Sequence, residues 1–148
     1  MYATAVALVE VDTLTGRTKV LRFLIAPDSG KVINPQGFRG QCEGAIVQGL
    51  GYALTEDAII QDGYLKAPNF TTYLIPTVMD VPEIEVTPVQ TFENTGPFGA
   101  KGAGEIALVP VAAAISNAIY DAVRVRSLTL PITPERLFNA LKAQNSQS

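Results

Sequence analysis

The amino-acid sequence predicts an α+β fold. A mixed or antiparallel sheet of about four strands begins with an N-terminal hairpin and is packed by two long helices and a short C-terminal helix. Three observations predict this fold: two Val-rich runs flank a turn near the N-terminus, an Asn-Pro pair opens a long stretch without further proline, and a nearly all-apolar, Ala-rich stretch follows residue 105. The chain has 148 residues, of which 47% are hydrophobic and 17% charged. This is enough for one domain with its own core, so residues 1–148 are taken as a single domain.

The first predicted element is an antiparallel hairpin formed by residues 2–11 and 19–26. These runs are rich in Val, Ala and Thr, and the turn cluster at 12–16 between them ends in a glycine that tolerates positive φ. Residues 20–25 are apolar at nearly every position, which predicts a central strand covered on two sides. The hairpin is therefore expected to belong to a larger sheet.

The next predicted element is a long helix that begins at Asn34 and ends near Thr55. Asn34 is a favourable N-cap, Pro35 suits the first helical position, and Ile33 is available for a hydrophobic staple. Residues 58–82 contain several Gly and Pro residues, which predicts a covering loop with short extended pieces.

Two further strands and two further helices complete the prediction. Residues 83–90 alternate in polarity and contain Pro88, which predicts an edge or bulged strand, and residues 125–130 are a candidate fourth strand. A second long helix is predicted from about Ile106 to Val123, buried on most sides because nearly all its residues are small or apolar. Thr133, Pro134 and Glu135 predict the start of a short helix that reaches about Lys142, followed by a frayed tail at 143–148.

Composition excludes several classes of function. The net charge of −3 offers no basic excess for nucleic acid. The absence of His and the presence of only Cys42 exclude a Cys/His zinc cage, an iron–sulfur cluster, a catalytic triad and a disulfide framework built from this chain alone. The longest apolar stretch, 106–115, is about half the ~20 residues that a membrane helix needs. The N-terminus also lacks the pattern of a secretory signal, so we expect a cytoplasmic protein that is not bound to a membrane.

Glycines repeat along one stripe of the first predicted helix, at positions 37, 40, 44 and 51. Each costs about 1 kcal/mol relative to Ala in a helix interior, so the stripe calls for a compensating contact. Gln41 and Gln48 lie beside it and can present amide groups. The stripe indicates either the close approach of a ligand or tight packing of the helix on the sheet.

The segment Gly99–Glu105 combines three glycines, Lys101 and a carboxylate just before the second predicted long helix. Approachable backbone N–H groups, a helix N-terminus and a lysine favour a polyanionic ligand beside a reacting atom. A Walker A loop is excluded because Gly102 follows the lysine, and the glycine spacing does not match a Rossmann fingerprint. The remaining alternative is a plain connector in which Glu105 is only a favourable charge at a helix start.

Two separated motifs carry a family resemblance. Asn34-Pro35 is followed by Gly40–Gly51 and then by Gly96–Glu105, and in this order they resemble the C-terminal part of the molybdenum-binding large subunit of the xanthine dehydrogenase and aldehyde oxidase family, the molybdenum hydroxylases. The resemblance runs along essentially the whole chain, including 117–122 and 130–135.

The resemblance implies a molybdenum–molybdopterin cofactor whose metal is held by no protein side chain. Gly40 and Gln41 would contact the cofactor, as would the loop Lys101, Gly102, Ala103 and Gly104, while Glu105 would act as a general base beside the metal. The implied reaction is hydroxylation of an aldehyde or an N-heterocycle, with the oxygen taken from water. Whether the pterin carries a cytosine dinucleotide is left open.

A large subunit of that family is several times longer than this chain, so 148 residues would supply one wall of the site and be catalytic only when assembled. The implied partners are the remaining domains of the large subunit, iron–sulfur and FAD subunits and a small-molecule substrate; the chain itself would carry neither iron–sulfur cluster nor flavin. Alone, its uncovered apolar surface would favour a homo-oligomer. Two alternatives stay open: a stand-alone or truncated, non-catalytic domain for cofactor binding or assembly, and a small-anion or nucleotide-binding protein that uses residues 101–105.

Overall fold

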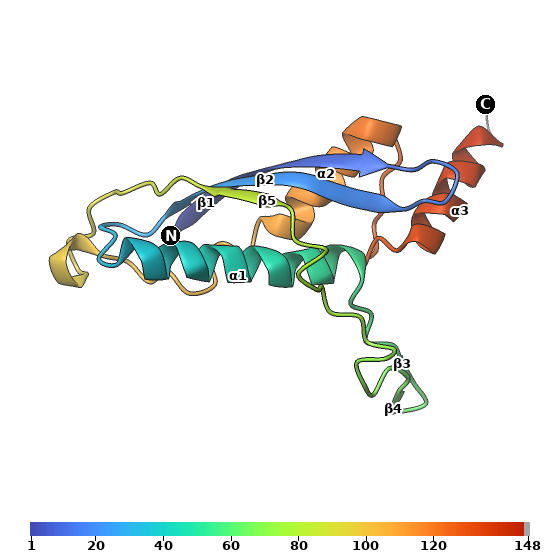
Figure 1. Ribbon diagram of the computed structural model, residues 1–148, viewed down its shortest axis with the longest axis horizontal. Helices are drawn as coiled ribbons and strands as arrows, with labels where there is room; N and C mark the ends of the chain where they lie inside the picture. The colour runs from blue at the N-terminus through green and yellow to red at the C-terminus, as the bar shows by residue number, and fades with distance from the viewer. Residues whose placement is uncertain (147–148) are drawn as a thin grey trace.

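The computed structural model of the protein describes residues 1–146. A mixed three-stranded sheet, in the order β1-β2-β5, lies over helices α1 and α2, and α3 lies at the end of the β1–β2 hairpin (Figure 1). The elements in chain order are β1 Tyr2–Val11, β2 Thr18–Asp28, α1 Pro35–Leu54, β3 Ile60–Gln61, β4 Tyr64–Leu65, β5 Glu83–Val86, the 3-10 turn η1 Pro97–Gly99, α2 Val111–Val123 and α3 Pro134–Asn145. The predicted α+β class is confirmed.

The predicted N-terminal hairpin is confirmed. β1 and β2 pair antiparallel, with a register shift between Leu8 and Val9. In the turn, Asp12 accepts a hydrogen bond from the amide of Leu14 (2.9 Å), and Gly16 has φ +73°. A Cβ on Gly16 would collide with the carbonyl oxygen of Pro134, so a glycine here lets α3 pack directly on the turn.

β2 is the central strand, as predicted, because β5 pairs with it in parallel and forms the opposite edge of the sheet. The expectation that β2 is covered on two sides is wrong. Val20, Phe23 and Ile25 are buried, whereas side chains between them, such as Leu21 at 38%, remain exposed. The reason is that α1 and α2 lie on the same face of the sheet (Figure 1), which leaves the other face uncovered in this chain.

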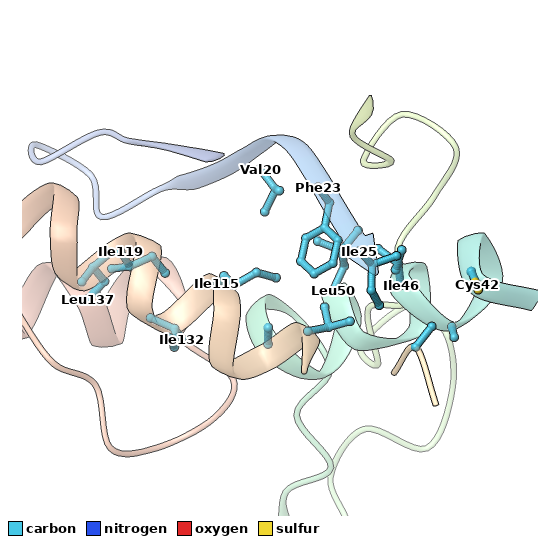
Figure 2. Packing of buried hydrophobic residues seen from close by; sticks show 14 of the residues in the cluster. Val20, Phe23, Ile25, Cys42, Ile46, Leu50, Ile115, Ile119, Ile132 and Leu137 are labelled. Carbon is cyan, nitrogen blue, oxygen red and sulfur yellow. The ribbon is translucent and has the colours of Figure 1, made fainter. Parts of the chain in front are cut away.

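The core lies between the inner face of the sheet and the two long helices. Figure 2 shows Val20 and Phe23 of β2 pointing toward Leu50 of α1 and Ile115 of α2. The inner face of β1 carries small side chains where it meets this core, namely Ala3, Ala5 and Ala7. Small residues on β1 allow the Ala-rich α2 to approach the strand closely.

Helix α1 begins as predicted, with Asn34 Oδ1 accepting a hydrogen bond from the amide of Gly37 (3.0 Å). Ile33, which is available for a hydrophobic staple, is 63% exposed and does not belong to the core. The helix ends at Leu54, and the amide of Ile132 donates to the carbonyl of Ala53 (2.6 Å), which satisfies one of the free acceptors at the helix end.

Helix α2 starts later than predicted, at Val111 rather than near Ile106. Pro110 has no N–H group and disfavours helical geometry at Val109, so residues 106–110 form turns and the regular helix follows them. The expectation of burial on most sides is also wrong. Val111, Ile115 and Ile119 form one buried face, while the alanines around them are half-buried or exposed.

The predicted fourth strand at 125–130 does not form, so the main sheet has three strands within the described residues. Arg124 ends α2 in the left-handed conformation, with φ 58°. Arg126 then turns back onto α2, where its guanidinium lies 4.2 Å from the centre of the Tyr120 ring and donates to Asn117 (2.8 Å). These contacts hold the segment on a helix surface rather than along a sheet edge.

Helix α3 is capped as predicted by Thr133, whose hydroxyl accepts from the amide of Arg136. It continues to Asn145, so the first residues of the predicted frayed tail are helical, and residues 147–148 lie outside the described part of the chain.

Residues 58–82 form a loop with two short strands, β3 and β4, as predicted. The expectation of a covering loop is wrong for the β3–β4 hairpin, which Figure 1 shows projecting away from the sheet and helices. Farther along the loop, Pro76 lies against Gly51 near the end of α1. The base of the loop is tied to the end of α1 by Tyr73, whose hydroxyl donates to Glu56 (2.6 Å), and this bond raises the pKa of Tyr73 to about 12. Of the helices described, none combines the length and apolarity that crossing a membrane requires.

Candidate functional site

The glycine-rich segment is joined by backbone hydrogen bonds to the turn that follows β2. The amide of Lys101 donates to the carbonyl of Ser29 (2.7 Å), and the amide of Lys31 donates to the carbonyl of Gly99 (2.9 Å). Gly30 lies between them with φ +63°, and a Cβ on it would collide with the carbonyl oxygen of Gly99. Only glycine permits this close approach of the two segments.

A cluster of Asp28, Thr91 and Lys101, hereafter the Asp28 cluster, joins the same two segments. The side chains of Asp28 and Lys101 are nearly buried, whereas Thr91 is exposed. Lys101 Nζ lies 2.6 Å from Asp28 Oδ2 and 2.6 Å from Thr91 Oγ1. Asp28 also accepts from the Thr91 hydroxyl (2.6 Å) and from the amides of Gly30 (3.0 Å) and Thr91 (3.3 Å). The Lys101 ammonium, followed by the Thr91 hydroxyl and the Gly30 amide, holds the pKa of Asp28 well below its usual value.

The Asp28 cluster changes the expected role of Lys101. The sequence pattern predicts that the lysine brings positive charge to a ligand, whereas its side chain is 12% exposed and paired within the chain. Asp28 and Thr91 were not among the predicted site residues. An Asp that directly follows an apolar strand and precedes Ser-Gly is the signal that points to Asp28, because a carboxylate at a buried strand end needs a partner.

After Lys101, the backbone amides of the next four residues have no hydrogen-bond acceptor within residues 1–146. These are the amides of Gly102, Ala103, Gly104 and Glu105. A Cβ on Gly104 would meet nothing within 4 Å, and one on Gly102 would meet only the Met1 side chain, at 3.8 Å. Four successive unpaired donors with open space beside them form a surface that can bind the acceptor groups of a ligand.

Glu105 lies in the turn before α2 and not at its first residue, so the predicted carboxylate at the mouth of a helix is wrong. Its carbonyl accepts from the amide of Leu108 (3.1 Å), and the helix begins six positions later in the chain. The carboxylate is exposed and, among the described residues, has no hydrogen bond or ion pair. The neighbouring residues Ile106 and Ala107 are buried, so they fix the backbone beside it.

On α1, the glycine stripe divides into an open part and a packed part. A Cβ on Gly40 or Gly44 would meet nothing within 4 Å, whereas one on Gly51 would collide with the Glu56 side chain and lie 2.9 Å from Cδ of Pro76. Gly49, outside the stripe, packs on α2, where a Cβ would lie 2.5 Å from Cβ of Val111. Gln41 is exposed and has no partner among residues 1–146, while Gln48 donates to the hydroxyl of Tyr52 (2.9 Å). The stripe is therefore open at Gly40 and Gly44 and closed at Gly51 by the chain that follows α1, and none of these glycines packs on the sheet.

The two parts of the predicted site, the start of α1 and the segment Gly102–Glu105, lie along the same helix. Lys101 is bonded to Ser29, just before α1 begins, and Val111 contacts Gly49 in the second half of α1. The segment between them therefore runs along the first half of α1, as Figure 1 also shows. This places Gly102–Glu105 on the part of the molecule where Gly40 and Gln41 are open, although no hydrogen bond joins the two groups within residues 1–146.

One hollow in the surface adjoins the glycine-rich loop, and another lies at the far end of α1. The first, of about 530 Å³, adjoins Gly102 beside Met1 and Glu93, and the second, of about 870 Å³, lies between the start of β2, the end of α1 and residues 74–83. Neither is lined by Gln41 or Glu105. In this chain the predicted contacts thus lie on an open surface rather than within a closed pocket.

Comparison with known proteins identifies the family. A family model described as a molybdopterin cofactor-binding domain matches residues 1–82, more than half of the chain. The chain belongs to this family. The predicted resemblance is thereby confirmed.

The chain is similar to parts of longer proteins. It is 39% identical over 140 residues to a probable xanthine dehydrogenase subunit from Bacillus subtilis, covering 95% of this chain and 19% of that protein. It is 38% identical over 148 residues to the 6-hydroxypseudooxynicotine dehydrogenase complex subunit gamma from Paenarthrobacter nicotinovorans, covering 97% of this chain and 19% of that protein. The chain thus spans about a fifth of the length of these curated relatives.

Solved structures agree with this assignment. The crystal structure of quinoline 2-oxidoreductase from Pseudomonas putida 86 matches with a TM-score of 0.86 and 38% identity, over 92% of this chain and 18% of that one. The chain therefore resembles one part of molybdenum-dependent oxidoreductases.

The residues present fit a molybdopterin cofactor. Such a group offers pterin and phosphate acceptors, and the open amides of Gly102–Glu105 and the free side-chain amide of Gln41 are matching donors within the described chain. Gly40 and Gly104 leave the space that a ligand in contact with the backbone requires. Because Asp28 neutralises the lysine charge, the groups that the loop offers to a ligand are its backbone amides.

Proposed function

We propose that this chain is the C-terminal part of the large subunit of a molybdenum hydroxylase and supplies one wall of its molybdopterin site. The observation that carries the proposal is the run of four amides at Gly102–Glu105, unpaired within residues 1–146, that ends in an exposed carboxylate without a partner there. A connector needs neither feature. Membership of the molybdopterin cofactor-binding domain family supports the assignment of the ligand.

The residues divide into binding and reacting groups. Gly40 and Gln41 on α1 approach the cofactor from one segment, and Gly102, Ala103 and Gly104 bind it through their amides. The bound cofactor supplies the redox chemistry of a hydroxylation in which water is the source of oxygen. Glu105 accepts a proton near the reacting atoms, which is the task of a general base.

The substrate class in this proposal is an aldehyde or an N-heterocycle. The name of the quinoline 2-oxidoreductase that matches this fold supports the second of these. The cofactor in its cytosine dinucleotide form is part of the proposal, as are iron–sulfur and FAD subunits that carry the electrons onward. A relative named as a subunit of a dehydrogenase complex supports such subunit partners.

The remaining walls of the site come from the part of the large subunit that the chain does not span. The chain covers 19% of its curated relatives, and both its candidate contacts and the outer face of its sheet are open. A separate non-catalytic role in cofactor binding or assembly is the second candidate, and the experiments below distinguish the two.

The decisive experiment replaces Glu105 by Gln in the protein as it is purified, with its partners, from its own cells. The amide keeps the size of the side chain and removes its basicity, so we expect kcat to fall by about 10²–10⁴-fold while molybdenum content, measured by metal analysis, is unchanged. Glu10→Gln on the exposed outer face of β1 is the matched control and should leave kcat unaltered.

An unchanged kcat in Glu105→Gln would remove the general-base role. Recovery of the chain alone and without molybdenum, as judged by native mass spectrometry, would instead favour the non-catalytic domain.

A further inference from the structure

We propose that the Asp28 cluster is a positioning device that fixes the loop Gly102–Gly104 and, through it, the carboxylate of Glu105. The effect on catalysis rests on the proposed function, whereas the fixing of the loop does not.

The Asp28 cluster joins three segments that are far apart in the chain. Asp28 ends β2, Thr91 follows β5, and Lys101 opens the glycine-rich loop; Asp28 is separated by 63 residues from Thr91 and by 73 from Lys101. The segments that contain Thr91 and Lys101 are thus both bonded to the central strand of the sheet. A contact between such distant segments restrains the loop more than any interaction within the loop itself.

The two charges of the cluster are paired with each other, so Lys101 brings no unpaired charge to a ligand. Two of the three Lys101 N–H donors are used at 2.6 Å, one by Asp28 and one by Thr91. The carboxylate accepts from four donors, and the two ionic side chains are only 12% and 9% exposed. Removing either charge leaves the other unpaired and poorly hydrated, which is a strongly unfavourable state.

Backbone bonds extend this restraint to the point where the loop becomes free. The amide of Lys101 is bonded to Ser29, and the next four amides have no acceptor in the described chain. On the far side, Ala103 packs on the core and Ile106 is buried. Glu105 therefore lies between two restrained positions. The Asp28 cluster restrains the chain before it through an ion pair, and the buried side chain of Ile106 restrains the chain after it.

The test is hydrogen–deuterium exchange on the protein as purified from its own cells, comparing Lys101→Met, Lys101→Arg and the unsubstituted protein. In Lys101→Met we expect the peptides that contain the bonded amides of Lys31 and residue 101 to exchange at least about tenfold faster, with core peptides of α1 and α2 unchanged. Lys101→Arg retains the charge and should restore much of the protection. Thr91→Val, which keeps both charges, gives a smaller change in the same direction if Lys101→Met does not fold.

The matched control is Glu85→Gln. It breaks an ion pair with Arg22 of similar length, 2.8 Å, but the two side chains are 44% and 49% exposed on the outer face of the sheet. Exchange at residues 28–31 and 99–101 should be unaffected. Equal exchange in folded Lys101→Met and unsubstituted protein would overturn the positioning role.

Steady-state kinetics separates positioning from cofactor binding. A positioning role predicts that Lys101→Met lowers kcat with KM and molybdenum content retained, and that Lys101→Arg recovers kcat. Loss of molybdenum with kcat per metal unchanged would show that the ammonium binds the cofactor and would overturn the proposal. If Glu105→Gln is itself without effect, the proposed function fails, but the exchange experiment still decides whether the loop is fixed by the cluster.

Discussion

At the scale of single residues, the two charged side chains of the glycine-rich segment have different environments. Lys101 and Glu105 are four positions apart, yet the first is paired and nearly buried and the second is exposed and, within residues 1–146, without a partner. Sequence patterns identify both residues but cannot assign these roles, because the partner of Lys101 lies 73 residues away at the end of β2.

Asp28 gives a pH-dependent prediction. Its pKa is lowered in the folded protein, so its contribution to stability is fully present above the unfolded-state pKa of about 3.9 and is lost as pH falls through the lower folded-state value. We expect Asp28→Asn to lower the urea midpoint at about pH 7 and the difference from the unsubstituted protein to narrow at about pH 2. Glu85→Gln should change the urea midpoint only slightly at either pH. A difference in urea midpoint for Asp28→Asn that stays constant with pH would contradict a lowered pKa of Asp28 in the folded protein.

At the scale of elements, the contact between α1 and α2 depends on one glycine. A Cβ on Gly49 would lie 2.5 Å from Cβ of Val111, closer than packed side chains allow, so the two helices meet with backbone against side chain at this point. The burial of Val111 at the first residue of α2 follows from the same contact. The end of the glycine-rich loop is thereby set against α1.

Substitution of Gly49 by Ala should separate the two helices. We expect the free energy of unfolding to fall by about 1–3 kcal/mol, because the added methyl group overpacks the contact. Gly44→Ala on the same helix meets open space and should stabilise the chain by up to about 1 kcal/mol through helix propensity. Urea denaturation of both variants tests this, and equal stabilisation by the two alanines would contradict the packing described here.

Element boundaries could be predicted where local chemistry decides them and not where packing does. The caps at Asn34 and Thr133 and the turn after Val11 are local, and the structure confirms them. The run 125–130 has strand-forming residues, but stacking of Arg126 on Tyr120 holds it to a helix, which no local pattern reveals. Of the candidate site, the open positions on α1 and the loop were predicted, whereas the Asp28 cluster depends on chain segments that only the fold brings together.

At the scale of the whole molecule, one face of the sheet has no cover among the described residues. Tyr2, Val6 and Leu8 on the outer face of β1 are 81%, 59% and 55% exposed, and β1 is also an edge strand with unpaired backbone groups. Such an edge with apolar side chains readily pairs with another chain.

Separated from its partners, the chain should self-associate through β1. We expect Val6→Lys to reduce association, measured by sedimentation velocity over a range of protein concentrations, because it places a charge on the edge strand. Leu128→Lys is the control, since Leu128 is equally apolar and 92% exposed but lies outside the sheet. A chain that remains monomeric at every concentration would contradict the expectation.

The long-range junction at Asp28 also has a consequence for the order of events in biosynthesis. Contacts between residues 63 and 73 positions apart form late, because the chain must first close large loops. The glycine-rich loop therefore acquires its shape only after β2 and β5 have paired. We expect a nascent chain to offer no ordered surface to the cofactor before that point, so that insertion of the cofactor follows folding of this region rather than guiding it.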